Sequence, residues 1–405
     1  MLFSYGRYIL PVLFVCVWPA RAELTLSNAV ATAVAGNPEL LAGRQRVEAA
    51  TGRAVQARAW PNPELELSAE DMPANQVGLA RSKNMIGIAQ TVPFPGKKSL
   101  DAQIGRREIS AAENEYRARE RDLVRSVTAA FYRALAAEQK VDVSRQLLDL
   151  SDSLVKVAGK RVEVGAAGNQ ESLRAEIELE RAHLELTTAR RELTESQQEL
   201  ATLLGRPREP LGALQGALRT AVPAVDATAL AQHPNLRAAR ANRERAEMEW
   251  RRAKLEPLPD VTFGVAGGRD TAVDENLLEF RVSLPLPLFD RGQGRKREAR
   301  ALADMARYDL TATEQRLLQD FDVAKTRLRA AGDQVDTYRT RILPKAEEAL
   351  RLVRSGFEAG KFGFLDLVDT QRTLAEARLA YWDKLLELNL TLADLEALAG
   401  NFNKE

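Results

Sequence analysis

The chain has 405 residues, and its 58 basic side chains nearly balance its 57 acidic ones. Such a balance gives no electrostatic reason to expect a nucleic-acid partner. After the first residues, no stretch approaches the ~20 apolar residues of a membrane-spanning helix.

Residues 1–22 predict a secretory signal peptide. Arg7 supplies the positive start, residues 9–17 form a short apolar run, and Ala20-Arg21-Ala22 fits an A-x-A cleavage site. The run is too short and wrongly flanked for a spanning helix. We therefore expect an exported chain that begins at Glu23.

The only cysteine, Cys16, lies inside this signal. A lipoprotein signal would carry a small residue just before the cysteine, where Val15 stands, so ordinary cleavage is favoured over lipidation. The mature chain then has no disulfide, thiolate nucleophile or thiolate metal site. Cleavage also removes Arg7 and Arg21, which leaves 56 basic and 57 acidic residues and a formal net charge of −1.

Proline and glycine divide the mature chain into elements. A helix of about thirty residues is expected up to the proline-rich turn at 60–63. The next elements are two strands at about 63–70 and 85–92, a long helix over 97–164, a glycine-containing hairpin tip at 165–168 and a shorter helix ending at Gly205. The long helix contains no proline, and at ~1.5 Å per residue it is a rod about 100 Å long.

A linker at 206–228 follows, and then the same elements recur. They are a helix ending at 256–259, strands at about 260–266 and 278–284, a long helix from Gly292 that Pro344 interrupts, a hairpin tip at 360–363, a helix ending at Gly400, and a tail at 401–405.

Five landmarks repeat at a nearly constant shift. The shift is 196 from Asn37-Pro38 to His233-Pro234 and from Pro61 to Pro257, 192 from Pro93 to Pro285, and 195 from Gly165 to Gly360 and from Gly205 to Gly400. Recurrence in the same order predicts that one unit is duplicated, with 23–205 as the first repeat and 229–400 as the second.

Small and apolar residues form a seam along the helices, with alternating steps of three and four. The seam of the first hairpin comprises Val127, Ala130, Ala134, Ala137, Val141, Ser144, Leu148, Ser151, Val155, Ala158 and Val162, then Ala175, Leu179, Ala182, Leu186, Ala189, Leu193, Ser196 and Leu200. This repeat predicts left-handed supercoiling. An ordinary helical bundle needs a similar seam, but it rarely uses helices of this length.

The strands alternate polar and apolar residues, as the wall of a water-filled barrel does. The alternation is clear at 64–70, 260–265 and 278–284 and weaker at 85–92, and we expect the segments 71–83 and 267–277 to be extracellular loops. Four strands with open edges cannot span lipid alone. Either two or three chains close a barrel of eight or twelve strands, or the strands cap a soluble periplasmic rod.

The repeated order of elements resembles the TolC-like outer-membrane efflux channels. The opening Leu24-Thr25-Leu26-Ser27-Asn28-Ala29 and the segment Asn37-Pro38-Glu39-Leu40 are similar to the start of that family. Pro61-Asn62-Pro63-Glu64-Leu65 and Gln90-Thr91-Val92-Pro93-Phe94-Pro95-Gly96-Lys97-Lys98 are most similar to its CzcC-type heavy-metal efflux branch. The resemblance covers essentially all of the mature chain.

The resemblance implies a mainly α fold with membrane β. It implies a homotrimer that forms a twelve-strand barrel in outer-membrane lipid and a twelve-helix periplasmic α-barrel. As function it implies a passive exit duct for heavy-metal cations, without a cofactor. The implied partners are a periplasmic adaptor and an inner-membrane pump of the resistance-nodulation-division (RND) type.

In this family the turns between paired helices form the periplasmic entrance and dock the adaptor. The resemblance therefore implies docking at Gly165, Gly168, Gly360, Phe362 and Gly363. Glycine suits such reversals because it reaches positive φ without strain.

Asp366 and Asp369 match the carboxylates that ring the closed aperture in relatives. Threefold symmetry would make them a ring of six, and charged rings select and gate cations. Glu171 and Arg174 hold the equivalent positions in the first repeat, and Arg174 would pair across the aperture. The alternative is that Asp366 and Asp369 only stabilise the first turn of their helix, because the helix dipole favours negative charge there.

Enzyme chemistry finds no support in the sequence. There are two histidines: His183 adjoins the seam and is expected to be solvated, whereas His233 replaces Asn37 in the repeat and is expected to cap a helix. The glycine-rich run 264–268 lacks the lysine of a phosphate loop. We therefore expect no enzyme and no dedicated transition-metal site, so a metal cargo would be conducted without being held.

Two alternatives to a metal duct remain open at this point. One is a soluble periplasmic coiled-coil adaptor or scaffold. An adaptor normally has one helical hairpin, however, and this sequence predicts two. The other is a TolC-like duct for drugs or secreted proteins.

Overall fold

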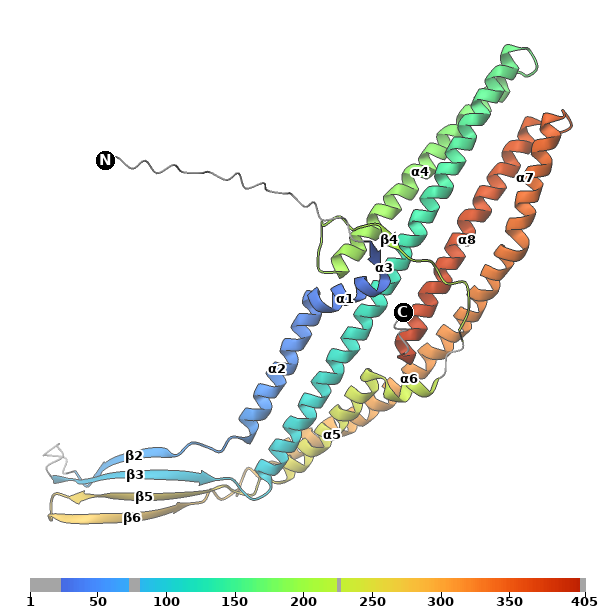
Figure 1. Cartoon of the computed structure of the whole chain (residues 1–405). Helices are drawn as coiled ribbons and strands as arrows, with labels where there is room; N and C mark the ends of the chain where they lie inside the picture. Colours follow the sequence, from blue (N-terminus) through green and yellow to red (C-terminus); the bar gives the residue numbers. More distant parts are fainter. Residues whose placement is uncertain (1–22, 73–80, 224–226, 401–405) are drawn as a thin grey trace, which may run out of the picture.

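The computed structural model describes residues 23–72, 81–223 and 227–400. The expected signal peptide 1–22, the tail 401–405 and most of the loop 71–83 lie outside these residues. The described chain is elongated, with a sheet at one end and the tips of two helical hairpins at the other (Figure 1).

The two repeats share the order helix, two strands, long helix and returning helix, which confirms the duplicated unit. The first comprises β1 (Leu24–Thr25), α1 (Leu26–Gly36), α2 (Pro38–Arg58), β2 (Glu64–Glu70), β3 (Lys83–Val92), α3 (Lys97–Glu163) and α4 (Asn169–Leu203). The linker holds β4 (Leu214–Gln215), which pairs with β1. The second comprises η2 (Ala227–Gln232), α5 (Pro234–Lys254), β5 (Val261–Asp270), β6 (Glu275–Ser283), α6 (Gln293–Thr337), the π-helical turn η3 (Tyr338–Ile342), α7 (Leu343–Glu358) and α8 (Phe364–Ala399).

The single thirty-residue helix expected before the first strands is wrong, because the chain breaks at Asn37. Pro38 disfavours helical backbone at the preceding residue. The Asn37 Oδ1 accepts a hydrogen bond from the Glu39 N–H at 2.9 Å and so caps α2. His233 caps α5 in the same way, with Nδ1 accepting from the Asn235 N–H at 3.2 Å, as the sequence predicted.

The long helix is confirmed, since α3 has 67 residues. It packs against α4 through the predicted seam, whose fully or nearly buried members include Val127, Ala130, Ala134, Ala158, Ala175, Ala182 and Leu186. In the second repeat η3 lies just before Pro344, where the missing N–H interrupts the helical hydrogen bonds. Within the described ranges, no helix combines the length and the apolarity needed to cross a bilayer.

The four longer strands form one antiparallel sheet in the order β2-β3-β5-β6. β3 and β5 join the two repeats through ten residue pairs, from Lys83↔Asp270 to Val92↔Val261. In the described part of the chain, β2 and β6 are each paired on one side only, so both edges of the sheet are open.

The two faces of the sheet differ in chemistry. One face is apolar except at its far end, where Arg269 is exposed; its exposed large apolar side chains are Leu65, Leu67, Ile86, Ile88, Phe263, Val265, Leu278, Phe280 and Val282. On the other face Arg281 pairs with Glu66 at 3.0 Å, and Lys83 pairs with Glu279 at 3.6 Å. The predicted alternation is confirmed, and β3 also follows it because its inward positions are small or buried residues such as Gly87.

The predicted loop 267–277 is wrong, because β5 and β6 extend through most of it and leave only residues 271–274 between them. The glycines that suggested a loop serve a close approach of β5 to β3. A Cβ at Gly268 would lie 1.9 Å from the Asn84 carbonyl oxygen, so only glycine fits there.

The linker between the repeats crosses the middle of the helical region (Figure 1). Asn389 on α8 is fully buried, and its side chain both donates to the Arg219 carbonyl and accepts from the Arg219 N–H, each at 2.9 Å. Further along the linker, Val222 lies against Gly332 of α6. The linker thus contacts the second repeat at the level of the largest apolar core.

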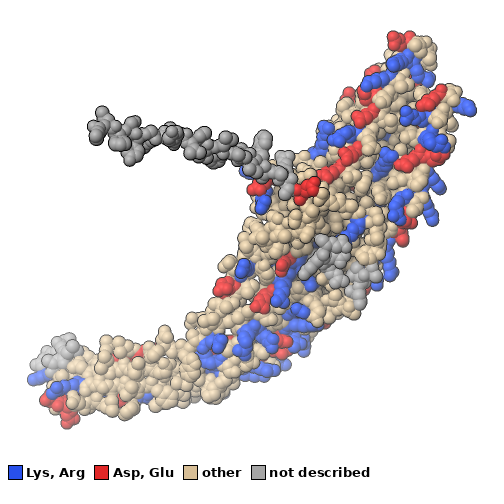
Figure 2. All heavy atoms as spheres, in the orientation of Figure 1, with Lys and Arg blue, Asp and Glu red and all other residues tan. Residues whose placement is uncertain are grey.

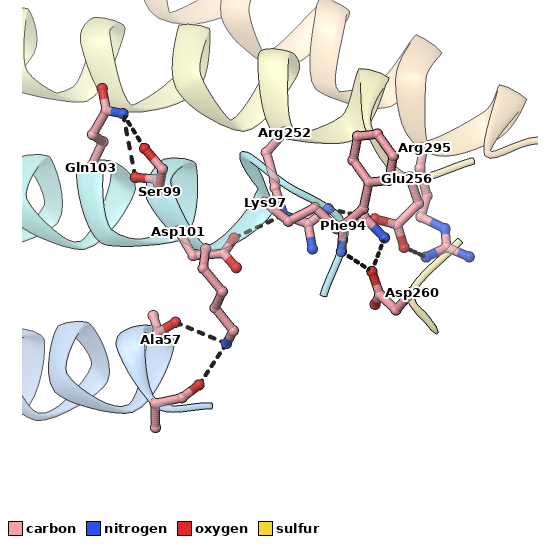
Figure 3. A network of polar contacts seen from close by, with 12 residues as sticks. Ala57, Phe94, Lys97, Ser99, Asp101, Gln103, Arg252, Glu256, Asp260 and Arg295 are labelled. Carbon is pink, nitrogen blue, oxygen red and sulfur yellow. Dashed lines mark hydrogen bonds and ion pairs between the residues drawn. The ribbon is translucent and has the colours of Figure 1, made fainter. Parts of the chain in front are cut away.

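Polar contacts join the sheet to the helices (Figure 3). The Asp260 Oδ1, just before β5, accepts hydrogen bonds from the Phe94 N–H at 2.7 Å and the Lys97 Nζ at 2.8 Å. The Lys98 Nζ donates to the Ala59 carbonyl at 2.6 Å. The start of α3 is therefore tied both to the second repeat and to the end of α2.

Candidate functional site at the hairpin tips

Both hairpins reverse through the same turn. Gly165 and Gly360 have φ of 73° and 71°, which confirms the left-handed conformation predicted for the reversals. The Ala166 N–H donates to the Arg161 carbonyl at 2.8 Å, and the Lys361 N–H donates to the Gly356 carbonyl at 2.7 Å. This is the Schellman pattern that closes a helix C-terminus.

The other two tip glycines have a different role from the one expected. Gly168 and Gly363 have φ of −82° and −80°, because they already occupy the extended N-cap positions of α4 and α8. Nearby, the Phe362 ring lies on α7, where a Cβ at Gly356 would be 2.1 Å from it. Phe362 keeps 46% of its surface exposed, and its docking role stays a prediction.

The two aspartates of the predicted gate lie in the first turns of α8, and both are exposed. The Asp366 Oδ2 accepts a hydrogen bond from the Gly363 N–H at 2.9 Å, which stabilises the helix start. Asp369 lies one turn later on the same side of the helix, and its side chain makes no such bond within the described chain. Asp366 therefore has a structural role, whereas Asp369 is exposed without one.

In the first repeat, Glu171 and Arg174, which hold the positions equivalent to the two aspartates, have different surroundings. Glu171 turns back to α3, where its Oε1 lies 3.1 Å from the Arg161 Nε. Arg174 is exposed on α4. The pairing of Arg174 across the aperture concerns neighbouring copies and stays a prediction.

Arg161 also connects the two hairpins. Its guanidinium lies 5.0 Å from the centroid of the Phe357 ring on α7, in cation–π geometry. Phe357 in turn packs beside Phe364, with ring centroids 6.3 Å apart. We call Arg161, Glu171 and Phe357 the tip clasp.

Apolar packing lies behind the clasp. Leu154, Ala158 and Ala175 of the first hairpin bury against Phe364 and Leu367 of α8. The four helices are thus in contact close to their tips, and opening an aperture between the hairpins requires this contact to change.

Groups that could support other chemistry are sparse in the described residues. No three His, Cys, Asp or Glu side chains gather there in a way that could hold a metal ion. His183 is exposed on α4, as expected for a solvated helix residue.

Comparison with known proteins identifies the family. The family of outer membrane efflux proteins matches residues 29–206 and 227–401, which together cover nearly all of both repeats. The chain belongs to the outer membrane efflux protein family. Members of this family are efflux channels, so the chain is an exit duct in the outer membrane, and its helical hairpins extend into the periplasm. This decides against the soluble adaptor.

Individual relatives agree with the family. The cobalt-zinc-cadmium resistance protein CzcC of Cupriavidus metallidurans is 30% identical over 370 residues, covering 89% of this chain and 86% of CzcC. The channel CusC matches the fold with a TM-score of 0.81 at 17% identity over 98% of both chains. The outer membrane protein VceC of Vibrio cholerae matches with a TM-score of 0.78 at 18% identity, over 93% of this chain and 96% of VceC. The predicted mainly α fold with a duplicated unit is confirmed, whereas the barrels formed by three copies stay a prediction.

Sequence reasoning missed the tip clasp. Arg161 and Phe357 are far apart in the sequence and occupy non-equivalent positions in the two repeats, so neither helical periodicity nor the repeat connects them. The nearest signal is that each residue lies three or four positions before a turn glycine, Gly165 or Gly360.

Proposed function

We propose that this exit duct conducts heavy-metal cations as the last part of a tripartite efflux system. The observation that carries the proposal is the 30% identity to CzcC across nearly the whole of both chains, because the name of CzcC assigns it to cobalt, zinc and cadmium resistance. A periplasmic adaptor and an RND-type inner-membrane pump would deliver the cations. A duct needs no binding site for its cargo, only a path and a gate.

Metal sensitivity of a deletion strain tests this proposal. Loss of the duct is expected to lower the inhibitory concentrations of cobalt, zinc and cadmium severalfold and to raise the cellular content of these metals. Hydrophobic drugs serve as the comparison. If the inhibitory concentrations of drugs fall and those of the metals stay constant, the duct serves drugs instead.

We also propose that three copies complete the channel wall. The open edges β2 and β6 need partners in lipid, and the repeat indicates how they pair. β6 corresponds to β3, and β2 corresponds to β5. Because Val92 pairs with Val261 inside one chain, Leu284 is expected opposite Leu65 of a neighbouring copy, and Val282 opposite Leu67. Both expected pairs are apolar and continue the apolar face.

Paired cysteines test this register, since the mature chain is expected to have none of its own. Leu67→Cys with Val282→Cys should yield covalent trimers with a short bis-maleimide, because directly opposite Cβ atoms are ~5 Å apart. Leu67→Cys with Arg281→Cys is the matched control, since Arg281 points to the other face and should not be linked. Equal linking of both pairs, or linked dimers only, would contradict the proposed ring.

The gate of this duct is proposed at the second tip. The exposed Asp366 and Asp369 would form the carboxylate ring, and the tip clasp would hold the hairpins together while the gate is closed. The adaptor would dock on the turns at Gly165, Gly168, Gly360, Phe362 and Gly363, where small residues leave the backbone accessible.

A further inference from the structure

We propose that the junction between the sheet and the helices binds the phosphate groups of phospholipids in the periplasmic leaflet of the outer membrane. Seven basic side chains near this junction have no carboxylate partner among the described residues: Arg58, Arg251, Lys254, Arg291, Lys296, Arg297 and Arg300. We call them the basic collar. In the same part of the described chain, only Glu64 and Glu298 are carboxylates without a basic partner, so positive charge is in clear excess.

Basic side chains gather on the surface of this region. Figure 2 shows basic side chains crowded where the mostly uncharged sheet meets the helices. Most collar residues are exposed, among them Arg58, Arg251, Arg297 and Arg300. Within a single chain they are therefore accessible to an external anion.

Ion pairs inside the junction account for the other charges there (Figure 3). Arg252 pairs with Asp101 at 2.9 Å and with Glu256 at 2.8 Å, and Lys97 pairs with Asp260 at 2.8 Å. These carboxylates already have partners, so they leave the charge of the collar largely uncompensated.

Helix stability does not explain the collar. Lys296, Arg297 and Arg300 lie in the first turns of α6, where the helix dipole disfavours cations. On other exposed helical surfaces an arginine often has a carboxylate three or four residues away, as Arg351 has Glu348 at 2.6 Å. Lys296 and Arg297 have no carboxylate at these spacings. Arg300 has Asp304 four residues later, but Asp304 pairs with Arg307 at 3.6 Å instead.

Exposed apolar side chains lie between the collar and the strands. Leu286 is 69% exposed, Leu288 63%, Phe289 93% and Trp60 59%. Leu284 continues the apolar face of β6 toward them. An apolar face followed by aromatic residues and then by cations is the order in which a protein meets acyl chains, the interface and the phosphates of a leaflet.

A neighbouring copy does not supply the missing negative charge. By the repeat, the start of α6 would lie against the end of α2 in the next copy, as the start of α3 lies against the end of α5 within one chain. After Glu48, α2 contains no carboxylate. Glu64, which follows α2 and is the repeat equivalent of Asp260, would bring one carboxylate to the start of α6, too little for seven cations. Lipid phosphates are therefore the anions that fit this position.

Native mass spectrometry of the detergent-solubilised full assembly tests the proposal. The protein is incubated with equal amounts of phosphatidylglycerol and phosphatidylcholine, and the retained lipids are counted. We expect phosphatidylglycerol to be retained at least about tenfold more, because several cations act on one anionic headgroup region. The preference should fall at high salt.

Three variants locate the effect. Lys296→Gln, Arg297→Gln and Arg300→Gln together are expected to remove most of the preference, whereas Lys325→Gln, Arg327→Gln and Arg329→Gln on the same helix should keep it. Arg297→Lys with Arg300→Lys should also keep it, which separates charge from misfolding. Equal retention of both lipids by the wild type, or an unchanged preference in the collar variant, would overturn the proposal. Loss of assembly without loss of preference would instead assign the collar to contacts between copies.

Discussion

The Arg161 guanidinium of the first hairpin lies 5.0 Å from the centroid of the Phe357 ring in the second. The same side chain forms an ion pair with Glu171 at 3.1 Å. One residue thus links α3, α4 and α7 near the tips, and relative movement of the hairpins must separate at least one of these contacts.

We expect Phe357→Ala to loosen the tips and raise single-channel conductance in planar bilayers. The variant removes the ring beneath Arg161, a cation–π contact of about 0.5–1 kcal/mol at an exposed site, together with its packing against Phe364. Phe357→Tyr keeps a ring and is the control, with conductance near that of the wild type. If Phe357→Ala conducts like Phe357→Tyr, the tip clasp does not restrain the gate.

The roles of Asp366 and Asp369 can be distinguished by measuring the stability of the start of α8 and the conductance of the channel. Asp366→Ala removes the hydrogen bond from the Gly363 N–H and should destabilise the start of α8 by about 1 kcal/mol, seen as faster amide exchange there. Asp369→Ala should leave this exchange unchanged.

Together, Asp366→Ala and Asp369→Ala should raise conductance and weaken block by multivalent cations, because a ring of carboxylates attracts such ions. Asp149→Ala on α3, an exposed acid away from the tip, is the control. Unchanged block in the double variant would reject the carboxylate gate and leave Asp366 with its capping role alone.

His233 makes stability depend on pH. Burial, with a smaller contribution from Arg121, lowers its pKa to about 4 from an ordinary 6.5. The folded chain therefore favours the neutral ring, so the stabilisation is complete above pH 6.5 and is lost as the pH falls toward 4. At pH 5 the loss approaches about 2 kcal/mol.

His233→Asn is the informative variant, because Asn37 already performs the same capping in the first repeat. It should keep the cap and reduce the drop in melting temperature between pH 7 and pH 5. An equal drop in wild type and variant would assign the acid sensitivity to other groups.

Gly268→Ala should prevent correct pairing of β3 with β5, since the new Cβ would lie 1.9 Å from the Asn84 carbonyl oxygen. The expected result is loss of protein from the outer membrane and loss of its heat-modifiable oligomer. Gly264→Ala in the same strand is the control, because its nearest neighbour would be at 3.5 Å and within normal contact. Equal assembly of both variants would contradict the close approach.

The features that the sequence predicted well are those that periodicity and repetition encode. The seam from Val127 to Ala158 follows from helical spacing, and the shift from Gly165 to Gly360 marks equivalent turns. The sequence could not separate a loop glycine from one that permits close strand approach, so the run at Gly267 and Gly268 was assigned to a loop. The break at Asn37 was missed although its signal is present, because Asn followed by Pro is a typical helix start and the equivalent His233 was expected to be a cap.

At the tips, residue types indicated the chemistry but not the partners. The acids at Asp366 and Glu171 occupy equivalent positions, yet one caps its own helix and the other reaches α3. This difference depends on Arg161, whose position in space is set by the coiled coil and not by its neighbours in sequence. The contact between Arg161 and Phe357 could not be predicted, because it depends on how the two hairpins pack against each other in the folded chain.

The unpaired edges at β2 and β6 have a genetic consequence. In the three-copy ring proposed above, a copy whose strands pair normally but whose tip is defective, such as Phe357→Ala, would enter rings together with wild-type copies. With equal expression, only about one ring in eight of three-copy rings contains wild-type copies alone. Tip alleles are therefore expected to be dominant in cells that carry both genes. Alleles that block strand pairing, such as Gly268→Ala, never join a ring and are expected to be recessive.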